Sequence, residues 1–376
     1  MLAGAANPPT LPANPTLEAA GVPLYPDLET YFAGNRADLA VISGPIQVHA
    51  PQTCLALAHG AHVLCEKPAA AAIQEVLEMR AAEQRVGRFA AIGYQWSFSP
   101  AVQALKRDIQ AGRFGRPLRL KTLVLWPRHR SYYTRNDWAG RLRSAGGHWV
   151  LDSPVQNATA HYLHNMFYLL GPTREQSSLP VSIEAELYRA NPIETYDAAA
   201  LRCLTASGVE VLYYAAHCVP EFQNPLMHFQ FERGEVRFDG GGDRRFTAHL
   251  PGGEVVDYGT PDGAEDEKLA QTLNAVRGGP PPACGLEAAS AHILAANGAQ
   301  QSCPVWPFPP EQVRITCTED NQLTWAEGLQ EALWAAFEGG LLPVETGRFA
   351  WARRGPLLDL RGYTLFEGVP KFRCPP

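Results

Sequence analysis

The sequence of 376 residues has no long hydrophobic run and no excess of basic charge. No apolar stretch approaches the roughly 20 residues that a membrane-spanning helix needs. The apolar start at residues 1–6 lacks a basic region, so we expect no signal peptide. The formal net charge of −6 gives no general attraction to nucleic acid or to an anionic membrane. We therefore expect neither as a partner.

Closely spaced cysteine pairs are also missing. The eight cysteines are dispersed and none forms a Cys-x-x-Cys motif. Several fall inside apolar strands or helices, as free buried thiols do. This pattern predicts a reducing, cytoplasmic location and no metal site. The length itself is sufficient for two domains with substantial cores.

The stretch from residue 37 to residue 68 predicts one βαβ unit. Residues 38–43 are nearly all apolar, which is typical of a strand buried on both faces of a parallel sheet. A turn at Gly44-Pro45 is followed by a helical pattern over residues 50–59 and a second strand over residues 63–65. Ligands of such sheets bind beyond the carboxyl ends of the strands. Two polar segments lie there: the loop at residues 43–49, and the pair Glu66-Lys67, whose backbone is made rigid by the following Pro68.

The two strand ends carry a recognisable pattern. One has Ser43, Pro45 and His49 in the spacing Ser/Thr-x-Pro-x-x-x-His, and the next reads His-Val-Leu-Cys-Glu-Lys-Pro over residues 62–68. This resembles the glucose–fructose oxidoreductase / inositol dehydrogenase family (Gfo/Idh/MocA), in detail over residues 24–171. The resemblance implies NAD or NADP as cofactor and a catalytic role for Lys67. It also implies cofactor contacts from a set of five residues: Ser43, Pro45, His49, Glu66 and Lys67.

The start of the sequence departs from that family. A dinucleotide-binding sheet should begin with a strand, a Gly-x-Gly-x-x-Gly turn and a helix that receives the pyrophosphate. Residues 2–7 instead look like the end of the family's second strand, followed by a helix at 15–20, a third strand at 22–25 and a helix capped by Asp27. The missing first strand would be central, so strands two and three should lose their link to strands four to six. We expect either an upstream start or a product with a damaged cofactor site.

Gln95 and Trp96 follow the last strand of the parallel sheet, predicted at residues 89–94 after a helix at 73–85. The resemblance places them over the nicotinamide or the substrate. Most relatives have an arginine near Ser97, so part of the usual polar anchoring is absent. The alternative is a plain linker between domains with aromatic residues that belong to the core.

Residues 128–147 form a long polar and aromatic segment, and a loop of this length is usually functional or mobile. Trp138 and three arginines, Arg128, Arg130 and Arg135, are candidates to line a pocket for a polyhydroxylated or acidic ligand. A solvated surface loop is the equal alternative.

Residues 152–171 predict one helix with Asp152 or Ser153 as its cap and Gly171 at its end. Asn157, His161 and Asn165 have the spacing i, i+4, i+8 and should share one face. The resemblance assigns the family's acid–base histidine to His161 and its aspartate to Asn157. An amide can orient a substrate hydroxyl but cannot take its proton. A lone helical histidine with a structural role is the alternative.

From residue 181 the hydrophobic period changes to two, with hairpin turns at 206–208, 232–234 and 251–253. Strands are expected over 117–126, 181–189, 197–205, 209–216, 227–231, 235–238, 245–249 and 254–258, and helices over 100–112, 265–276, 286–296 and 326–337. This predicts a large, mostly antiparallel open-faced sheet with flanking helices. Its free face is a candidate interface for a homodimer or homotetramer.

The predicted fold class is thus α/β plus α+β. A Rossmann-like, N-terminally incomplete NAD(P)-binding domain covers residues 1–95, and a substrate-binding and oligomerisation domain covers 96–376. The resemblance implies an NAD(P)-dependent oxidoreductase acting on a secondary alcohol or ketone of a sugar, a cyclitol or a related small molecule. Lys67 and His161 would be catalytic, and Gln95, Trp96, Asn157 and Trp138 would bind substrate. The alternatives are a non-catalytic NAD(P)- or sugar-binding regulator and a truncated product with impaired cofactor binding.

Overall fold

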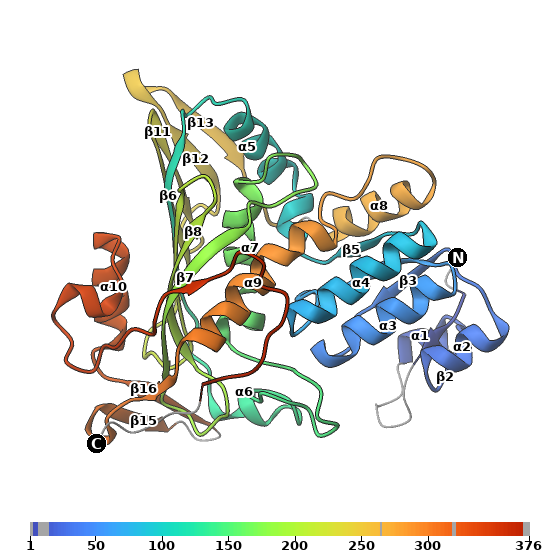
Figure 1. The fold of residues 1–376 in the computed structure, drawn as a ribbon, viewed down its shortest axis with the longest axis horizontal. Coiled ribbons are helices and arrows are strands. Elements are labelled where there is room, and N and C mark those ends of the chain that lie inside the picture. Colours follow the sequence, from blue (N-terminus) through green and yellow to red (C-terminus); the bar gives the residue numbers. More distant parts are fainter. Residues whose placement is uncertain (1–2, 7–14, 264, 318–320, 371–376) are drawn as a thin grey trace.

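The computed structural model of the protein describes residues 3–6, 15–263, 265–317 and 321–370. Leu2 and Asn7 of the strand expected at residues 2–7, and Cys374, lie outside these residues. Within them, a small α/β part with parallel strands is packed against a larger part built on one extensive sheet (Figure 1). No helix of the described ranges has the length and apolar character that a membrane crossing requires.

The parallel strands of the α/β part are divided between two separate sheets, as far as the described residues go. β1 (Ala5–Ala6) pairs with β2 (Leu24–Tyr25), whereas β3 (Leu39–Ile42), β4 (His62–Cys65) and β5 (Ala90–Ile92) form a second sheet in that order. The expected loss of connection between these two groups of strands is therefore present. It leaves β3 at an edge of its sheet, and Val41 is 60% exposed. The prediction that this strand is buried on both faces was wrong at Val41, because nothing in the described part of the chain covers that side of the strand.

The helices of this part follow the predicted order, with bounds α1 (Pro15–Ala19), α2 (Leu28–Gly34), α3 (Ile46–Ala58) and α4 (Ile73–Val86). Asp27 caps α2 by accepting a hydrogen bond of 2.7 Å from the Thr30 N–H, as expected. α3 begins four residues earlier than predicted and contains Pro51. α4 ends at Gly87, whose φ of 64° is the left-handed conformation that glycine adopts without strain.

The larger part is organised on a mixed sheet of ten described strands in the order β13-β12-β11-β10-β6-β9-β8-β7-β14, with β17 also paired to β7. Most neighbours are antiparallel, but β6–β9 and β14–β7 are parallel. The three predicted hairpins are confirmed. The strand bounds are β6 (Pro117–Leu125), β7 (Pro180–Arg189), β8 (Ala198–Thr205), β9 (Glu210–Ala216), β10 (Gln223–Phe231), β11 (Gly234–Asp239), β12 (Phe246–His249), β13 (Val255–Gly259), β14 (Val305–Pro307) and β17 (Leu358–Asp359).

Helices cover the side of this sheet that faces the α/β part (Figure 1). They are α5 (Pro100–Gln110), α7 (Ala160–Leu169) and α9 (Leu286–Ser302), while α8 (Glu265–Val276) contacts β4. α9 also packs on α4 and β5, so one hydrophobic core extends through both parts of the molecule. The short helical segments that precede α8 are η1 (Gln95–Phe98), α6 (Arg130–Thr134), a π-helical turn, η2 (Pro154–Ala158), and η3 (Pro251–Gly253) in the turn between β12 and β13.

The opposite face of the sheet is not as open as the sequence suggested. α10 (Leu329–Gly339) lies on it, and a second hydrophobic core beneath α10 includes Tyr188, Leu212 and Tyr214. The helix predicted at 326–337 in fact starts at Leu329, after a hairpin of β15 (Val313–Cys317) and β16 (Gln322–Ala326) that sequence patterns missed. The η4 (Pro310–Gln312) and η5 (Pro343–Thr346) turns flank these elements.

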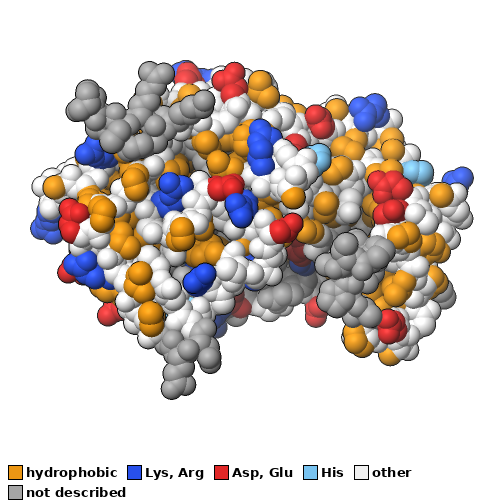
Figure 2. Space-filling view, turned by 90° about the horizontal axis from the view of Figure 1, so that it is seen from below, with side chains coloured by type: hydrophobic (Ala, Val, Ile, Leu, Met, Phe, Trp, Pro, Cys, Tyr) orange, Lys and Arg blue, Asp and Glu red, His pale blue; other side chains and the backbone are white. Residues whose placement is uncertain are grey.

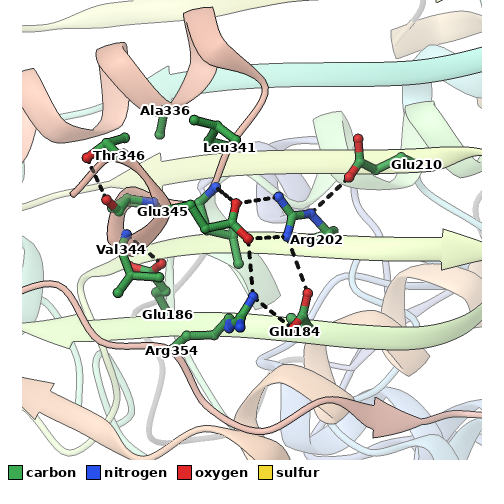
Figure 3. A network of polar contacts seen from close by, with 12 residues as sticks. Glu184, Glu186, Arg202, Glu210, Ala336, Leu341, Val344, Glu345, Thr346 and Arg354 are labelled. Carbon is green, nitrogen blue, oxygen red and sulfur yellow. Dashed lines mark hydrogen bonds and ion pairs between the residues drawn. The ribbon is translucent and has the colours of Figure 1, made fainter.

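A polar network fastens the C-terminal segment to this face (Figure 3). Arg202 on β8 contacts Glu210 at 2.9 Å and Glu345 of η5, and Arg354 bridges Glu184 and Glu345. Beside it, Glu186 accepts hydrogen bonds from the Val344 N–H at 3.0 Å and from the Tyr188 hydroxyl. Burial raises the pKa of Glu186 to about 7. Elsewhere the surface is of mixed charge, with basic and acidic side chains interspersed on the face shown in Figure 2.

Candidate active site at the ends of the parallel strands

Lys67 lies where the sequence predicted, just beyond the carboxyl end of β4, and it reaches a segment far away in the chain. Its Nζ donates to the backbone oxygen of Asn157 at 2.8 Å and to the Asn157 side-chain oxygen at 3.1 Å. The structure therefore brings two predicted site residues together. An ammonium group has three N–H donors, so these two bonds leave one donor for a ligand.

Asp152 is a site residue that sequence analysis missed. Its Oδ1 accepts a hydrogen bond of 2.7 Å from the Asn157 side-chain amide, and its Oδ2 accepts one of 2.8 Å from the Gly140 N–H. The first bond orients the amide so that its oxygen faces Lys67. Burial raises the pKa of Asp152, although Arg135 and Lys67 oppose this effect by favouring the carboxylate. Asp152 thus places a carboxyl group behind Asn157, where the sequence appeared to offer an amide alone.

The backbone around Asp152 is unusual. Leu151, which is fully buried, has a φ of 54°, a left-handed conformation that costs a non-glycine residue roughly 1 kcal/mol or more. Bonds from Leu151 and Asp152 N–H groups to the Leu142 and Arg141 carbonyls hold this conformation. Such conformations cluster at functional sites.

The helix predicted over residues 152–171 is broken into two pieces, so that prediction was wrong in detail. Ser153 caps the π-helical turn η2 through a 3.1 Å bond from the Gln156 N–H, and α7 starts afresh at Ala160 after Thr159. The break changes the helical register, so i, i+4, i+8 spacing no longer places three residues on one face. Asn165 is fully buried, and its amide has no hydrogen-bond partner among the described residues.

His161 faces the same region as Lys67. Its half-buried ring meets the edge of Tyr94 at 5.9 Å between centroids, and Nδ1 has no hydrogen-bond partner within the described part of the chain. Desolvation holds its pKa well below the ordinary value, and the charges of Lys67 and Lys268 lower it further. The imidazole is therefore neutral near pH 7. A neutral ring is the form that accepts a proton.

Glu66 forms an ion pair with Lys268, a residue of α8 that sequence analysis did not single out. Gly93 explains how the Glu66 side chain fits. A Cβ added at Gly93 would lie 2.9 Å from Glu66 Oε2 and 3.2 Å from its Cα, so only glycine leaves this space. The Glu66–Lys268 pair therefore links the end of β4 to the larger part of the molecule.

The loop after β3 presents its predicted residues in two different ways. Ser43 and Pro45 are exposed, whereas His49 is buried, with Nδ1 at 2.7 Å from the Pro68 oxygen and Nε2 at 2.9 Å from the Gly44 oxygen. Burial lowers the pKa of His49, which favours a neutral ring that donates to one of the two oxygens. His49 thus ties the two strand ends together.

Gln95 is half-buried, while Trp96 is 5% exposed and packs against Tyr162, Phe238 and Phe246. This packing fits the alternative of a core aromatic residue. Ser97 is buried, and its hydroxyl lies 2.9 Å from His164 Nε2. Ser97 therefore belongs to an internal polar cluster rather than to the surface of the site.

The surroundings of Lys67 shift the pKa of its amine. Burial lowers its pKa to about 8, while Glu66 and Asp152 raise it and Arg135 and Lys268 lower it. Arg135 belongs to the loop that follows β6 and lies over the rings of Tyr132 and Trp138, at 3.6 and 5.3 Å from their centroids. The predicted loop residues Arg135 and Trp138 thus border the cluster around Lys67. Arg130 is exposed.

The fold is that of a Rossmann-type protein with a second, α+β part. Its parallel strands carry a lysine at one strand end, and the large mixed sheet lies behind them. Residues 2–94 match the GFO_IDH_MocA model, described as an oxidoreductase family with an NAD-binding Rossmann fold. Over these residues the chain is similar to members of that family.

Three similar proteins span different shares of the chain. The 1-carboxy-3-chloro-3,4-dihydroxycyclo hexa-1,5-diene dehydrogenase of Comamonas testosteroni is 33% identical over 93 residues, which are 25% of this chain and 23% of that protein. Inositol 2-dehydrogenase 4 of Saccharopolyspora erythraea is 29% identical over 266 residues, 68% of this chain and 69% of that protein. The Bordetella pertussis WlbA dehydrogenase, solved in complex with NADH and UDP-GlcNAcA, shares the fold with a TM-score of 0.62 and 21% identity over 76% of this chain and 83% of its own.

Proposed function

We propose that this protein is an NAD(P)-dependent oxidoreductase that interconverts a secondary alcohol and a ketone on a sugar, a cyclitol or a related polyol. The observation that carries the proposal is the contact of Lys67 Nζ with Asn157, backed by Asp152 and beside a neutral His161. The dehydrogenases named above support the substrate class, since inositol is a cyclitol.

The residues present fit the nicotinamide end of NAD or NADP. Ser43 and Pro45 are exposed at the end of β3, and Glu66 and Lys67 lie at the end of the adjacent β4. We propose that these residues, with His49 as the support of the loop, contact that end of the cofactor. The described residues contain no glycine-rich turn for the pyrophosphate, so the proposal extends to the nicotinamide side alone. When bound, the cofactor supplies hydride transfer.

The chain's own residues would manage the substrate oxygen and its proton. The remaining N–H of Lys67 would donate to the reacting oxygen and stabilise the negative charge that develops there. His161, neutral at pH 7, would take the hydroxyl proton during oxidation and return it during reduction. Asp152 would act through Asn157 as a positioning residue, and Asn157 and Gln95 would bind other hydroxyls of the substrate, with Trp138 at the edge of the site.

We propose that the two predicted domains have the two binding roles that the sequence suggested. Residues 1–95 would hold the cofactor, and residues 96–376 would hold the substrate. Assembly into a homodimer or homotetramer would use the part of the large sheet that α10 does not cover, where Val255 on β13 is 57% exposed. Light scattering tests this assembly, and a monomer at micromolar concentration would contradict it.

The experiment that tests the function is Lys67→Ala assayed with NAD+ and NADP+ against a panel of inositols and sugars. We expect kcat to fall at least about a hundredfold, because the variant loses a positioned charge at the reacting oxygen. Thermal unfolding of the variant controls for folding. Unchanged turnover would remove Lys67 from the mechanism.

A non-catalytic regulator is the second candidate, and Asn157 favours it because an amide replaces the family's aspartate. Titration of NADH fluorescence separates the two functions. A regulator binds NADH and shows no turnover with any member of the panel, whereas an enzyme shows both. A protein that binds no dinucleotide would contradict both the enzyme and an NAD(P)-binding regulator, and titration with sugars then tests a sugar-binding regulator.

A further inference from the structure

A group of polar atoms without partners surrounds the ring of Tyr132, in the loop that follows β6. The Arg128 guanidinium lies 4.7 Å from the Tyr132 centroid and 5.4 Å from that of Trp126. Arg135 lies 3.6 Å from the Tyr132 centroid. Two guanidinium groups therefore share one aromatic ring, close to the proposed site of reaction.

Neither arginine has a carboxylate partner among the described residues. Arg135 donates from Nη1 to the backbone oxygen of Tyr132 at 2.6 Å, and the buried Nε of Arg128 has no hydrogen-bond partner in the described part of the chain. Arg141, on the same loop, contrasts with them because it pairs with Glu194 at 2.7 Å. A planar guanidinium presents several donors in a fixed geometry that suits a carboxylate. Arg128 and Arg135 are thus held in place by aromatic rings with most of their donors unused.

His217 supplies an independent feature. It is 2% exposed, its ring lies 5.6 Å from that of Tyr132, and its Nε2 has no partner within the described residues. Its Nδ1 lies 2.9 Å from the Trp126 oxygen, which can only accept, so the proton is on Nδ1 and Nε2 is left as an acceptor. Burial and the Arg128 charge lower the pKa of His217 to about 3, so it remains neutral. A buried acceptor without a partner costs free energy unless a ligand or water satisfies it.

We propose that these residues form an acid subsite, in which Arg128 and Arg135 bind the carboxylate of a polyhydroxylated acid and His217 accepts from a neighbouring hydroxyl. This inference rests on the proposed function and narrows its substrate to a sugar acid or a related hydroxy acid. The partners are complementary: two cations with free donors face an anion, and a neutral imidazole with a free lone pair faces an O–H group.

The charges around the subsite agree with this assignment. Arg135 acts electrostatically on both Lys67 and Asp152, which places the carboxylate end of the substrate near the reacting end. Asp152, Arg128 and Arg135 all act electrostatically on Tyr132, and Glu66 and Asp152 both act on Lys67. Asp197 and Glu194, which also lie near this loop, are already engaged: Asp197 by Asn191 and the Ala190 N–H, and Glu194 by Arg141. An anionic ligand would balance the remaining positive charge.

Isothermal titration with D-gluconate and D-glucitol tests the subsite, with and without NAD+. The two probes share a carbon chain, but glucitol has a CH2OH group in place of the carboxylate. We expect gluconate to bind at least tenfold tighter than glucitol. Arg128→Gln and Arg135→Gln should each weaken gluconate binding about tenfold, as loss of a charge-assisted hydrogen bond does, and leave glucitol binding unchanged. Arg135→Lys should recover part of the loss.

Arg143→Gln is the matched control. Arg143 lies on the same loop but over Trp149, at 3.3 Å from the ring, and this variant should bind gluconate as the unmodified protein does. Arg135 is exposed, so its replacement tests the subsite even if Arg128→Gln fails to fold. The proposal would be overturned if gluconate and glucitol bound with equal affinity. It would also be overturned if Arg143→Gln weakened gluconate binding as much as Arg128→Gln or Arg135→Gln does, or if gluconate, galacturonate and tartrate all failed to bind. Because binding is measured without turnover, this result is independent of the Lys67→Ala assay.

Discussion

The Nζ atom of Lys67 lies 2.8 Å from the backbone oxygen of Asn157, although the two residues are 90 positions apart in the chain. One belongs to the end of β4 and the other to a π-helical turn before α7. Their contact joins the α/β part to the larger part at the point where both present polar groups. The pKa values of Lys67 and His161 make this junction sensitive to single charges, which leads to measurable expectations.

Asp152→Asn should weaken catalysis by disturbing the group behind Lys67. The carboxylate orients Asn157 and raises the pKa of Lys67, so its loss should lower that pKa below its present value of about 8. We expect kcat to fall about tenfold and the alkaline limb of the pH profile of kcat/KM to move to lower pH. Glu194→Gln, which removes a carboxylate from Arg141 in the same loop, should leave that limb in place. An unmoved limb in Asp152→Asn contradicts a positioning role.

Lys67→Arg should keep a cation at the end of β4 at every accessible pH, because guanidinium groups lose their proton only above about pH 12. The alkaline limb that Lys67 sets at about pH 8 should therefore disappear. The flat guanidinium cannot reproduce the ammonium geometry, so we expect kcat to fall roughly tenfold to a hundredfold. Rate measurements from pH 6 to 10 check this. A limb that persists near pH 8 would assign it to another group.

Lys268→Met should shift the whole profile toward alkaline pH. The Lys268 charge lowers the pKa of both His161 and Lys67, so its removal should raise both. The acid limb, where His161 becomes protonated and inactive as a base, then moves to higher pH, and the alkaline limb moves with it. Arg174→Met, a cation change elsewhere in the larger part, serves as the control. Limbs that stay in place in Lys268→Met would show that its charge does not reach the site.

Glu186 should make stability depend on pH. Its pKa is raised from 4.5 to about 7, so the folded state keeps a proton that the unfolded chain releases. The free energy of unfolding should therefore decrease through this group as pH rises from about 4.5 to 7, by up to about 3 kcal/mol. Glu186→Gln keeps an acceptor for the Val344 N–H and should abolish this decrease. Urea unfolding at pH 5 and pH 8 measures it, with the exposed Glu338→Gln as a control for net charge.

Much of the local structure could be predicted because its causes are local. The apolar run at 38–43, the left-handed glycine after α4 and the turn at 206–208 each indicate an element through residues that are neighbours in sequence. The Glu66-Lys67 pair was placed correctly for the same reason, since a strand that ends before it determines its position. Failures followed where the competing structure was non-local. The π-helical turn at Pro154 and the helix α10 over the sheet reflect packing that no periodicity reveals.

The sequence by itself determined the parallel strands, the hairpins and the lysine at a strand end, because hydrophobic period and turn residues act over a few positions. The tertiary structure alone decided that Asp152 supports Asn157, that Lys268 pairs with Glu66 from 202 positions away, and that two arginines and His217 share the ring of Tyr132. These contacts depend on which segments are buried together. Burial sets the desolvation that shifts each pKa, and it leaves certain polar atoms without partners.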